Sequence, residues 1–138
     1  MPESVFVDSA FLIGLTDARD SSRQIALELM DQLTRSRTNL TTSDAILIEY
    51  ANYFSRGGNY RLTVAGFIDR IRDHAGWEIV TVSIGLVMRA ESRYRRYTDK
   101  DWSMTDCISM ELMLDRKLKR IATTDHGFEQ AGFEVLMR

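Results

Sequence analysis

Apolar residues along the chain alternate between short strand-like runs and longer stretches at near-helical spacing. The strand-like runs are Val5–Val7, Asn39–Thr42, Trp77–Val82, Lys119–Thr123 and Phe133–Leu136. The helical stretches are Ser21–Arg35, Asp44–Phe54, Arg61–His74, one after an N-cap at Ser83 that runs through Tyr97, and one after an N-cap at Ser103 that runs through Leu114. Short strands that alternate with helices predict an α/β fold, in which a parallel sheet is covered on both faces. The crossover connections should be right-handed.

The chain shows no sign of a second domain. Its 138 residues include one proline, at position 2, and neither a low-complexity stretch nor an internal repeat. Hydrophobic residues make up 44% and charged residues 28%, which is typical of a globular protein. We therefore expect a single domain over residues 1–138.

Several features favour a cytoplasmic location. Cys107 is the only cysteine, so no intrachain disulfide forms, as is usual inside cells. No apolar run approaches the roughly 18 residues of a membrane span. The N-terminus, Met1 to Ser4, lacks the basic start and apolar core of a signal peptide. We expect no contact with a membrane.

The overall charge argues against a general nucleic-acid binder. The net charge is -2 and the sequence pI is near 5.7, whereas such binders are more often basic. Any contact with nucleic acid must therefore come from a local patch. Part of the acidity also fits a site whose charge a cation neutralises.

Two of the strand-like runs lead into an aspartate. Val5–Val7 runs into Asp8, and the fourth run leads through Thr124 into Asp125. The carboxyl ends of parallel strands meet at one edge of a sheet, which is where open α/β sheets bind ligands. The sequence therefore places both aspartates at the same candidate site.

Two further acids stand in unusual settings. Glu49 lies within an apolar helical stretch, and Asp106 lies in the first turn of the helix that Ser103 opens. If these acids converge with the two aspartates, their repulsion raises some pKa values, and a cation relieves it. A set of oxygen ligands suits Mg²⁺ or Mn²⁺ rather than zinc. The two histidines, His74 and His126, lack zinc-ligand spacing with the cysteine, although His126 stands beside Asp125.

Each acid also has a purely structural interpretation. Asp8 fits a turn or an N-cap, Asp106 fits the acid of a capping box, and Asp125 fits a cap of the short helix through Glu129. Taken singly, the structural interpretation is favoured for Asp106 and Asp125. Glu49 is harder to explain in this way, because a charge among apolar residues costs several kcal/mol unless it is paired, solvated or bound to a cation. One face of its helix reaching water would provide that solvation.

At these residues the chain resembles the PIN-domain family, and the resemblance covers essentially its whole length. Four segments resemble the family's motifs in the correct order: Val7–Leu12, Thr42–Glu49, Asp101–Cys107, and Thr123–Phe128 followed by Ala131, Gly132 and Phe133. The small size resembles the stand-alone, VapC-like toxin ribonucleases. The resemblance implies a three-layer α/β/α sandwich with a central parallel sheet of four to five strands.

The resemblance also implies an activity, a cofactor and partners. It implies a metal-dependent endoribonuclease that cleaves single-stranded RNA, with Mg²⁺ or Mn²⁺ held by four catalytic acids. These acids are Asp8, Glu49, Asp106 and Asp125. Ser9 or Thr124 would supply a supporting hydroxyl, and Asp101 either assists the metal site or is a solvated loop acid. Small members of the family are commonly toxins of bacterial toxin–antitoxin pairs, so a small cognate antitoxin and a homodimer are implied as well.

A basic helix before the third motif is the candidate RNA contact. Arg89, Arg93 and Arg96 share one helix face, and Tyr94 and Tyr97 are interleaved with them. The arginines fit RNA phosphates, while a tyrosine stacks on an unpaired base. A solvated helix face, with the tyrosines packed on the protein, explains the pattern equally well.

Two other functions remain open alongside the endoribonuclease. One is a catalytically degenerate RNA-binding or interaction module, against which the presence of all four acids counts. The other is a different metal-dependent enzyme, namely a phosphoesterase or a DNA nuclease. Metal-dependent cleavage of single-stranded RNA, without action on duplex DNA or small phosphoesters, distinguishes these functions.

Overall fold

The structure, a computed structural model, describes residues 4–56 and 58–138. Residues 1–3, which bear on the expected absence of a signal peptide, and Gly57 lie outside the described residues. The elements follow one another as β1 (Val5–Val7), α1 (Ser9–Thr16), α2 (Arg23–Arg35), β2 (Leu40–Ser43), α3 (Asp44–Tyr53), α4 (Tyr60–Asp73), β3 (Trp77–Val80), α5 (Ile84–Arg96), α6 (Met104–Arg116), β4 (Arg120–Ala122), α7 (Gly127–Gln130) and β5 (Glu134–Val135).

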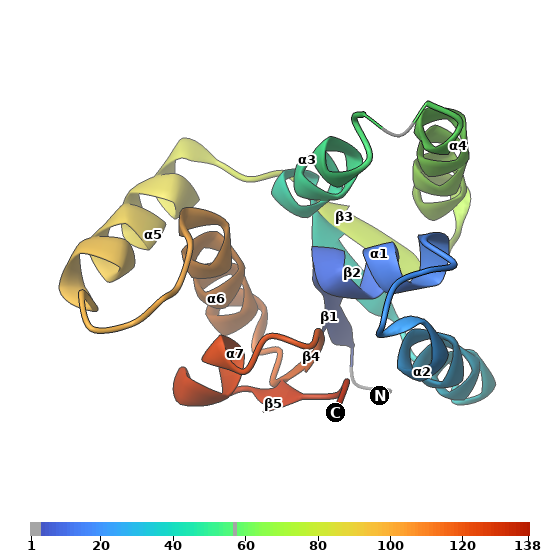
Figure 1. The fold of residues 1–138 in the computed structure, drawn as a ribbon. Coiled ribbons are helices and arrows are strands. Elements are labelled where there is room, and N and C mark those ends of the chain that lie inside the picture. The colour runs from blue at the N-terminus through green and yellow to red at the C-terminus, as the bar shows by residue number, and fades with distance from the viewer. Residues whose placement is uncertain (1–3, 57) are drawn as a thin grey trace.

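The strands form one parallel sheet in the order β3-β2-β1-β4-β5. Phe6 in the central strand pairs with Thr41 of β2 on one side and with Ile121 of β4 on the other. Helices α1 to α4 lie on one side of the sheet, and α5 and α6 lie on the other (Figure 1). The predicted three-layer α/β/α fold is therefore confirmed.

The strand order contains a switch of direction that positions the site. From β1 the chain moves outward through β2 to β3, and then α5 and α6 carry it back across the sheet to β4. The chain therefore leaves β1 in one direction and returns on its other side, so the switch point of the sheet lies at the carboxyl ends of β1 and β4. Open α/β sheets bind their ligands at such a switch point.

The local sequence explains where α5 and α6 begin. Ser83 and Ser103 are N-caps as predicted, because their hydroxyls accept hydrogen bonds from the amides of Leu86 (3.1 Å) and Asp106 (3.0 Å). Strand β3 ends two residues earlier than the predicted Val82. The Val82 amide instead donates to the Asp44 carboxylate at 3.1 Å, which takes that amide out of the strand ladder.

Aromatic packing fixes α3 against its neighbours. The fully buried Tyr50 forms a 2.5 Å hydrogen bond with the hydroxyl of Thr16 at the end of α1. Its ring meets Phe67 of α4 edge to face, with centroids 6.3 Å apart. The predicted helical hairpin of α3 and α4 is thus held to the core. Because Glu49 precedes Tyr50 on α3, the same packing also fixes the position of Glu49.

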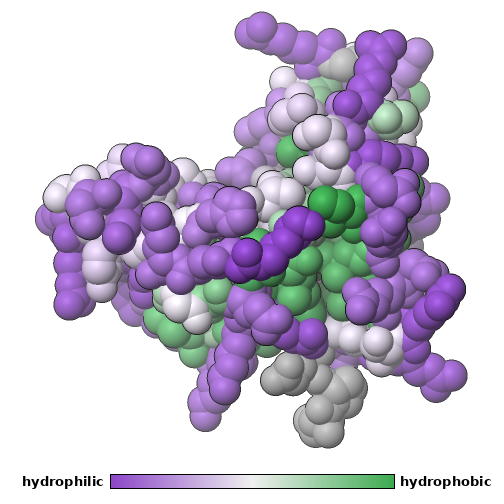
Figure 2. Space-filling view, turned by 60° about the horizontal axis from the view of Figure 1, so that its bottom comes forward, coloured by the Kyte–Doolittle hydropathy of each residue, from purple (hydrophilic) through white to green (hydrophobic). Residues whose placement is uncertain are grey.

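The end of the sheet where the strands begin is apolar. Figure 2, which views the molecule from the side of the two termini, shows one hydrophobic area between hydrophilic surfaces. A cavity of about 430 Å³ lies at this end, and its lining includes Leu33, Leu40 and Trp77. The acids lie at the opposite, carboxyl end. Among the described residues, no helix is long and apolar enough to span a membrane.

Candidate active site

Asp8 is the most deeply buried of the four acids. It follows the central strand β1 and is only 5% exposed. Although it occupies the N-cap position of α1, its carboxylate makes no capping hydrogen bond. The carboxylate instead accepts a 2.6 Å hydrogen bond from the buried hydroxyl of Thr123, just beyond β4. The capping interpretation therefore does not explain the side chain of Asp8.

Thr123 connects two of the predicted acids. Its hydroxyl donates to Asp8 and accepts a hydrogen bond from the Asp125 amide at 3.1 Å. The sequence predicts Thr124 as the supporting hydroxyl, whereas the residue that contacts Asp8 is its neighbour. In the structure Thr123 ends a run, Ile121 to Thr123, in which every residue is fully buried, and no local sequence pattern distinguishes it from Thr124.

Glu49 is joined to the N-terminus of α1. Ser9, the first residue of α1, donates a short hydrogen bond from its hydroxyl to the Glu49 carboxylate. Glu49 is half-buried, while its neighbour Ile48 is 61% exposed, so this face of α3 does reach solvent. The pairing with Ser9 places the carboxylate beside the residue that follows Asp8. Whether Ser9 acts as a supporting hydroxyl in the site stays a prediction.

Asp106 has a structural contact as well as a place in the site. Its carboxylate accepts the Ser103 amide at 3.0 Å while Ser103 accepts the Asp106 amide, so the predicted capping box is present. A carboxylate has several acceptor positions, so this bond leaves capacity for another ligand. The cap orients Asp106 at the positive end of α6.

Asp125 lies at the open side of the site. It is exposed, and its carboxylate accepts the Gly127 amide at 2.8 Å. Gly127 is closely surrounded, because a Cβ there would lie 3.0 Å from an Asp125 oxygen and 3.1 Å from the Trp102 ring. The glycine therefore allows Asp125 and the indole to approach the start of α7 together.

Electrostatic coupling connects all four carboxylates. Burial raises the pKa of Asp8 from 3.8 to about 7, against the lowering effect of the Thr123 hydrogen bond, and the charges of Asp106 and Glu49 raise it further. Burial likewise raises the pKa of Asp106 to about 6, with further increases from Asp125 and Glu49. The four acids that the sequence selects therefore share one electrostatic field.

The donor set fits a hard divalent cation, although the side chains are not closed around one. Within residues 4–56 and 58–138, no group of three or more Asp, Glu, His or Cys side chains forms a ready metal cluster. Repulsion between the negative charges favours separated carboxylates. Hydrogen bonds fix the orientation of three of them: Ser9 donates to Glu49, Thr123 donates to Asp8, and the Ser103 amide donates to Asp106. Buried carboxylates with raised pKa values and only oxygen donors are suited to Mg²⁺ or Mn²⁺.

Two other predicted candidates lie at the margin. Asp101 is exposed and is not among the groups that raise the pKa of Asp8 or of Asp106. His126 is exposed, and its Nδ1 lies 3.1 Å from the carboxylate of Glu129, one turn along α7. Whether Asp101 assists the site stays a prediction.

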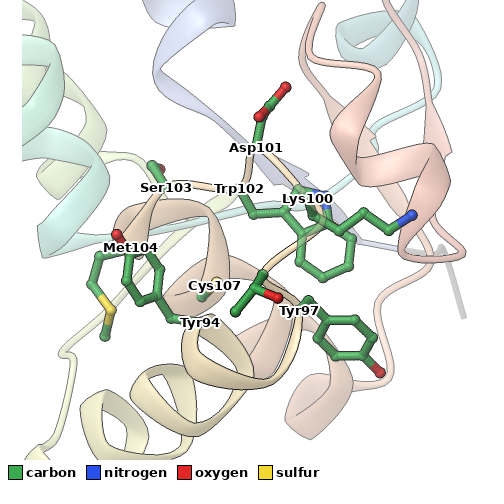
Figure 3. Close-up of a pocket in the computed structure, with 9 residues that line it drawn as sticks. Tyr94, Tyr97, Lys100, Asp101, Trp102, Ser103, Met104 and Cys107 are labelled. Carbon is green, nitrogen blue, oxygen red and sulfur yellow. The ribbon is translucent and has the colours of Figure 1, made fainter.

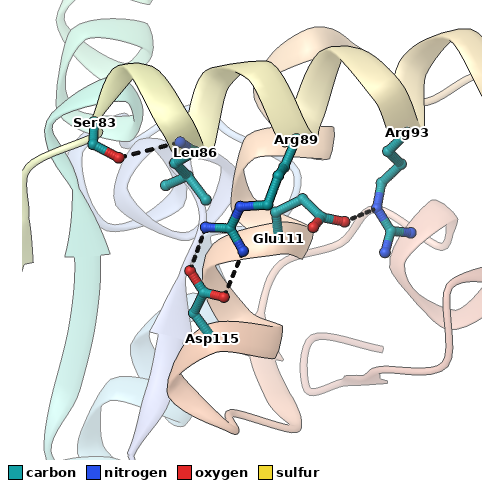
Figure 4. Close-up of polar contacts among 6 residues, drawn as sticks. All are labelled: Ser83, Leu86, Arg89, Arg93, Glu111 and Asp115. Atoms are coloured by element: carbon teal, nitrogen blue, oxygen red, sulfur yellow. Dashed lines mark hydrogen bonds and ion pairs between the residues drawn. The ribbon is translucent and has the colours of Figure 1, made fainter.

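Two of the three predicted RNA-binding arginines already bind acids of α6. Arg89 makes a bidentate pair with Asp115 at 2.7 and 2.6 Å, and the Arg93 Nε donates to Glu111 at 2.7 Å (Figure 4). These pairs join α5 to α6 at matching one-turn intervals. Arg96 is exposed and lies over the Tyr97 ring, 5.4 Å from its centroid. Arg89 and Arg93 therefore hold α5 in place, and of the three arginines Arg96 has the most accessible charge.

The parallel sheet, with its carboxylates at the switch point, defines an α/β protein with an acidic site at the carboxyl edge. The PIN domain family matches residues 5–134 of the chain. Because the match covers nearly the whole chain, the protein belongs to the PIN domain family. This membership supports a nuclease as the class of protein.

The fold has a solved counterpart. The crystal structure of Mycobacterium tuberculosis VapC20, a sarcin-ricin loop cleaving toxin, matches this structure with a TM-score of 0.79. The two sequences are 23% identical, and the match covers 94% of this chain and 95% of that one. The similarity shows a shared fold over nearly the full length of both chains. No curated protein matches the chain.

Proposed function

We propose that the protein is a metal-dependent endoribonuclease that cleaves single-stranded RNA. The observation that carries this proposal is the shared field of Asp8, Glu49, Asp106 and Asp125 at the switch point of the sheet. Membership of the PIN domain family supports the nuclease class, and the fold shared with VapC20 supports RNA as the substrate. The cytoplasm is the expected place of action.

The proposed roles of the four acids follow their burial. Asp8, Glu49 and Asp106 would hold Mg²⁺ or Mn²⁺, while the exposed Asp125 would complete the site or orient the attacking water. A bound ion of this kind lowers the pKa of water and neutralises charge on the phosphate oxygens. Thr123 keeps Asp8 directed by donating to its carboxylate. No histidine or lysine is needed as a general base.

We further propose that the protein is the toxin of a toxin–antitoxin pair and forms a homodimer. The support is the fold shared with a toxin of comparable length, since the match covers 95% of that chain. An arginine from a small antitoxin could pair bidentately with the site carboxylates and displace the metal. An amphipathic helix of the antitoxin would supply apolar contacts in a surface groove. Coexpression with a candidate antitoxin should suppress the ribonuclease activity, and unchanged activity would contradict the toxin assignment.

The direct test of the proposed function is cleavage of a labelled single-stranded RNA. The wild-type protein should cleave it with Mg²⁺ or Mn²⁺ and lose activity in EDTA. Asp8→Asn should abolish cleavage while the protein stays folded, because the variant keeps the size of the side chain but loses a charged ligand. Asp69→Asn, an exposed substitution on α4, is the matched control and should retain full activity.

The same assay separates the alternatives. Cleavage of duplex DNA or of a small phosphoester, without cleavage of RNA, would identify a different phosphoesterase. RNA binding without any metal-dependent cleavage would identify a non-catalytic module. Wild-type rates in Asp8→Asn would refute the assignment of the site residues.

A further inference from the structure

A pocket of about 600 Å³ opens beside the loop that leads to Asp106. It lies between the C-terminal half of α5 and the start of α6, and Tyr94, Tyr97, Lys100, Trp102 and Met104 contribute to its lining (Figure 3). Its volume falls within the roughly 300–1,000 Å³ of typical small-ligand sites. The pocket is therefore large enough for a ligand the size of a nucleoside.

One wall of the pocket is a fixed aromatic group. The rings of Tyr97 and Trp102 lie 5.1 Å apart, and Arg93 lies 5.8 Å from the centroid of each. Arg93 is itself held by its ion pair with Glu111, in which both side chains are mostly buried. Trp102 is only 7% exposed. This wall is preorganised, because each member is fixed by a neighbour.

Tyr94, unlike these aromatic residues, has a ring that is free to stack on a ligand. It is 55% exposed, and within residues 4–56 and 58–138 it takes part in no ring pair and no cation–π contact. Figure 3 shows Tyr94, from α5, and Trp102, from the loop, on two sides of the pocket. An exposed tyrosine opposite a fixed aromatic wall offers a flat ring a stacking surface.

The pocket is connected directly to the acidic site. The Trp102 indole donates a 2.9 Å hydrogen bond to the carbonyl of Gly127, whose amide binds Asp125. Ser103, which also lines the pocket, forms the capping box with Asp106. A ligand in this pocket therefore lies beside the segments that position two of the four acids.

We propose that this pocket binds one unpaired nucleobase of the RNA substrate, stacked on Tyr94, and so selects the nucleotide that lies near the cleaved phosphate. The inference rests on the proposed function, which names single-stranded RNA as the substrate. Stacking of bases on aromatic side chains next to basic residues is the common way in which proteins hold single strands.

The chemistry of the rim favours RNA over a protein segment. Lys100 lines the pocket, where it pairs with Asp99 at 3.5 Å, and the exposed Arg96 lies beside the pocket over the ring of Tyr97. These two cations suit the phosphates that flank a bound base. Asp101 and Ser103 provide polar groups for the hydrogen-bonding edge of the base.

The test measures RNA binding separately from cleavage. Four labelled RNA octamers, of A, C, G and U, are titrated with protein in Ca²⁺ in place of Mg²⁺, and intact RNA is verified on a gel. The octamer that binds best is then remade as a series, each member lacking one base. Tyr94→Ala should weaken binding of the intact octamer about tenfold, the effect of losing one stacked base. In the series, the RNA that lacks the stacked base should bind wild type about as weakly as the intact octamer binds Tyr94→Ala. Loss of that same base should weaken binding to Tyr94→Ala only slightly further.

Two variants control for indirect effects. Tyr94→Phe keeps the ring and should bind within about twofold of wild type. Met88→Ala removes a side chain of similar exposure from the same helix, 60% against 55%, and should leave binding unchanged. Circular dichroism of all three variants verifies that α5 is intact.

The outcomes separate this inference from the proposed function. If wild type and Tyr94→Ala bind RNA equally well, or if removal of each base weakens both proteins equally, the pocket does not bind a base. Either result would leave the proposed RNA cleavage unaffected. Failure of the wild type to bind any octamer would also overturn the inference about the pocket. A Tyr94 effect that depends on one base, in a protein without nuclease activity, would support the pocket and refute the proposed function. Unchanged RNA binding with lost binding of a protein partner would assign the pocket to that partner.

Discussion

Asp8→Asn should make the metal-free protein more stable at neutral pH, even though it removes a site residue. In the folded protein the pKa of Asp8 is raised from 3.8 to about 7, chiefly because the carboxyl group is buried. The folded state therefore holds a proton that the unfolded state releases between about pH 4 and pH 7. Stability that is present below pH 4 is lost as the pH rises through this window, and the loss is complete above pH 7.

The shift sets the size of the effect. A shift of about three pKa units corresponds to about 4 kcal/mol at 1.36 kcal/mol per unit, which is an upper limit for the gain of Asp8→Asn at pH 8. The asparagine oxygen can still accept the hydrogen bond from Thr123, so the variant should not lose that contact. Asp106, whose pKa is raised to about 6, adds a change in the same direction in both proteins.

The measurement is urea unfolding in EDTA at pH 4 and pH 8. Wild type should lose stability between these values, and Asp8→Asn should lose less and exceed wild type at pH 8. Asp69→Asn, exposed on α4, should follow wild type. If Asp8→Asn is no more stable than wild type at pH 8, and its free energy of unfolding depends on pH in the same way, then burial of the ionised Asp8 carboxylate does not destabilise the fold.

Three further predictions concern the metal and the contacts around the site. Added Mn²⁺ should raise the melting temperature of wild type, by mass action on the folded state, and raise that of Asp8→Asn less; equal shifts would contradict the site. Thr123→Val should cost about 1–3 kcal/mol in urea unfolding and slow RNA cleavage, because Asp8 loses its buried donor, whereas Thr123→Ser should restore both. Arg93→Met should cost about 2 kcal/mol by breaking its mostly buried pair with Glu111, against less than about 1 kcal/mol for Arg89→Met at its half-exposed pair; equal costs would refute this ranking.

The sequence was a good guide where one local rule decided the outcome. The alternation of apolar strand-like runs with helices predicted the parallel sheet. The settings of the acids and the resemblance to the PIN-domain family selected four carboxylates whose charges are coupled in the structure. Ser103 and Asp106 show the limit of this approach, since the same pair satisfies a capping box and a place at the site.

Contacts between distant segments could not be read from local patterns. Thr123 was missed because its role depends on its 2.6 Å approach to Asp8, which lies 115 residues earlier. The basic face of α5 was ambiguous for the same reason. Only the packing of α5 on α6 shows that Arg89 and Arg93 face Asp115 and Glu111.

The most direct test of the central claim is the position of Mn²⁺ in a crystal of the protein, located by anomalous scattering. The account predicts a peak at the carboxyl edge of the sheet, between β1 and β4, with oxygen contacts of about 2.0–2.6 Å to Asp8 and to at least one of Glu49 and Asp106. The side chains of these acids should close around the ion from their separated positions. A strong peak on another face of the protein, with these carboxylates unchanged, would contradict the account.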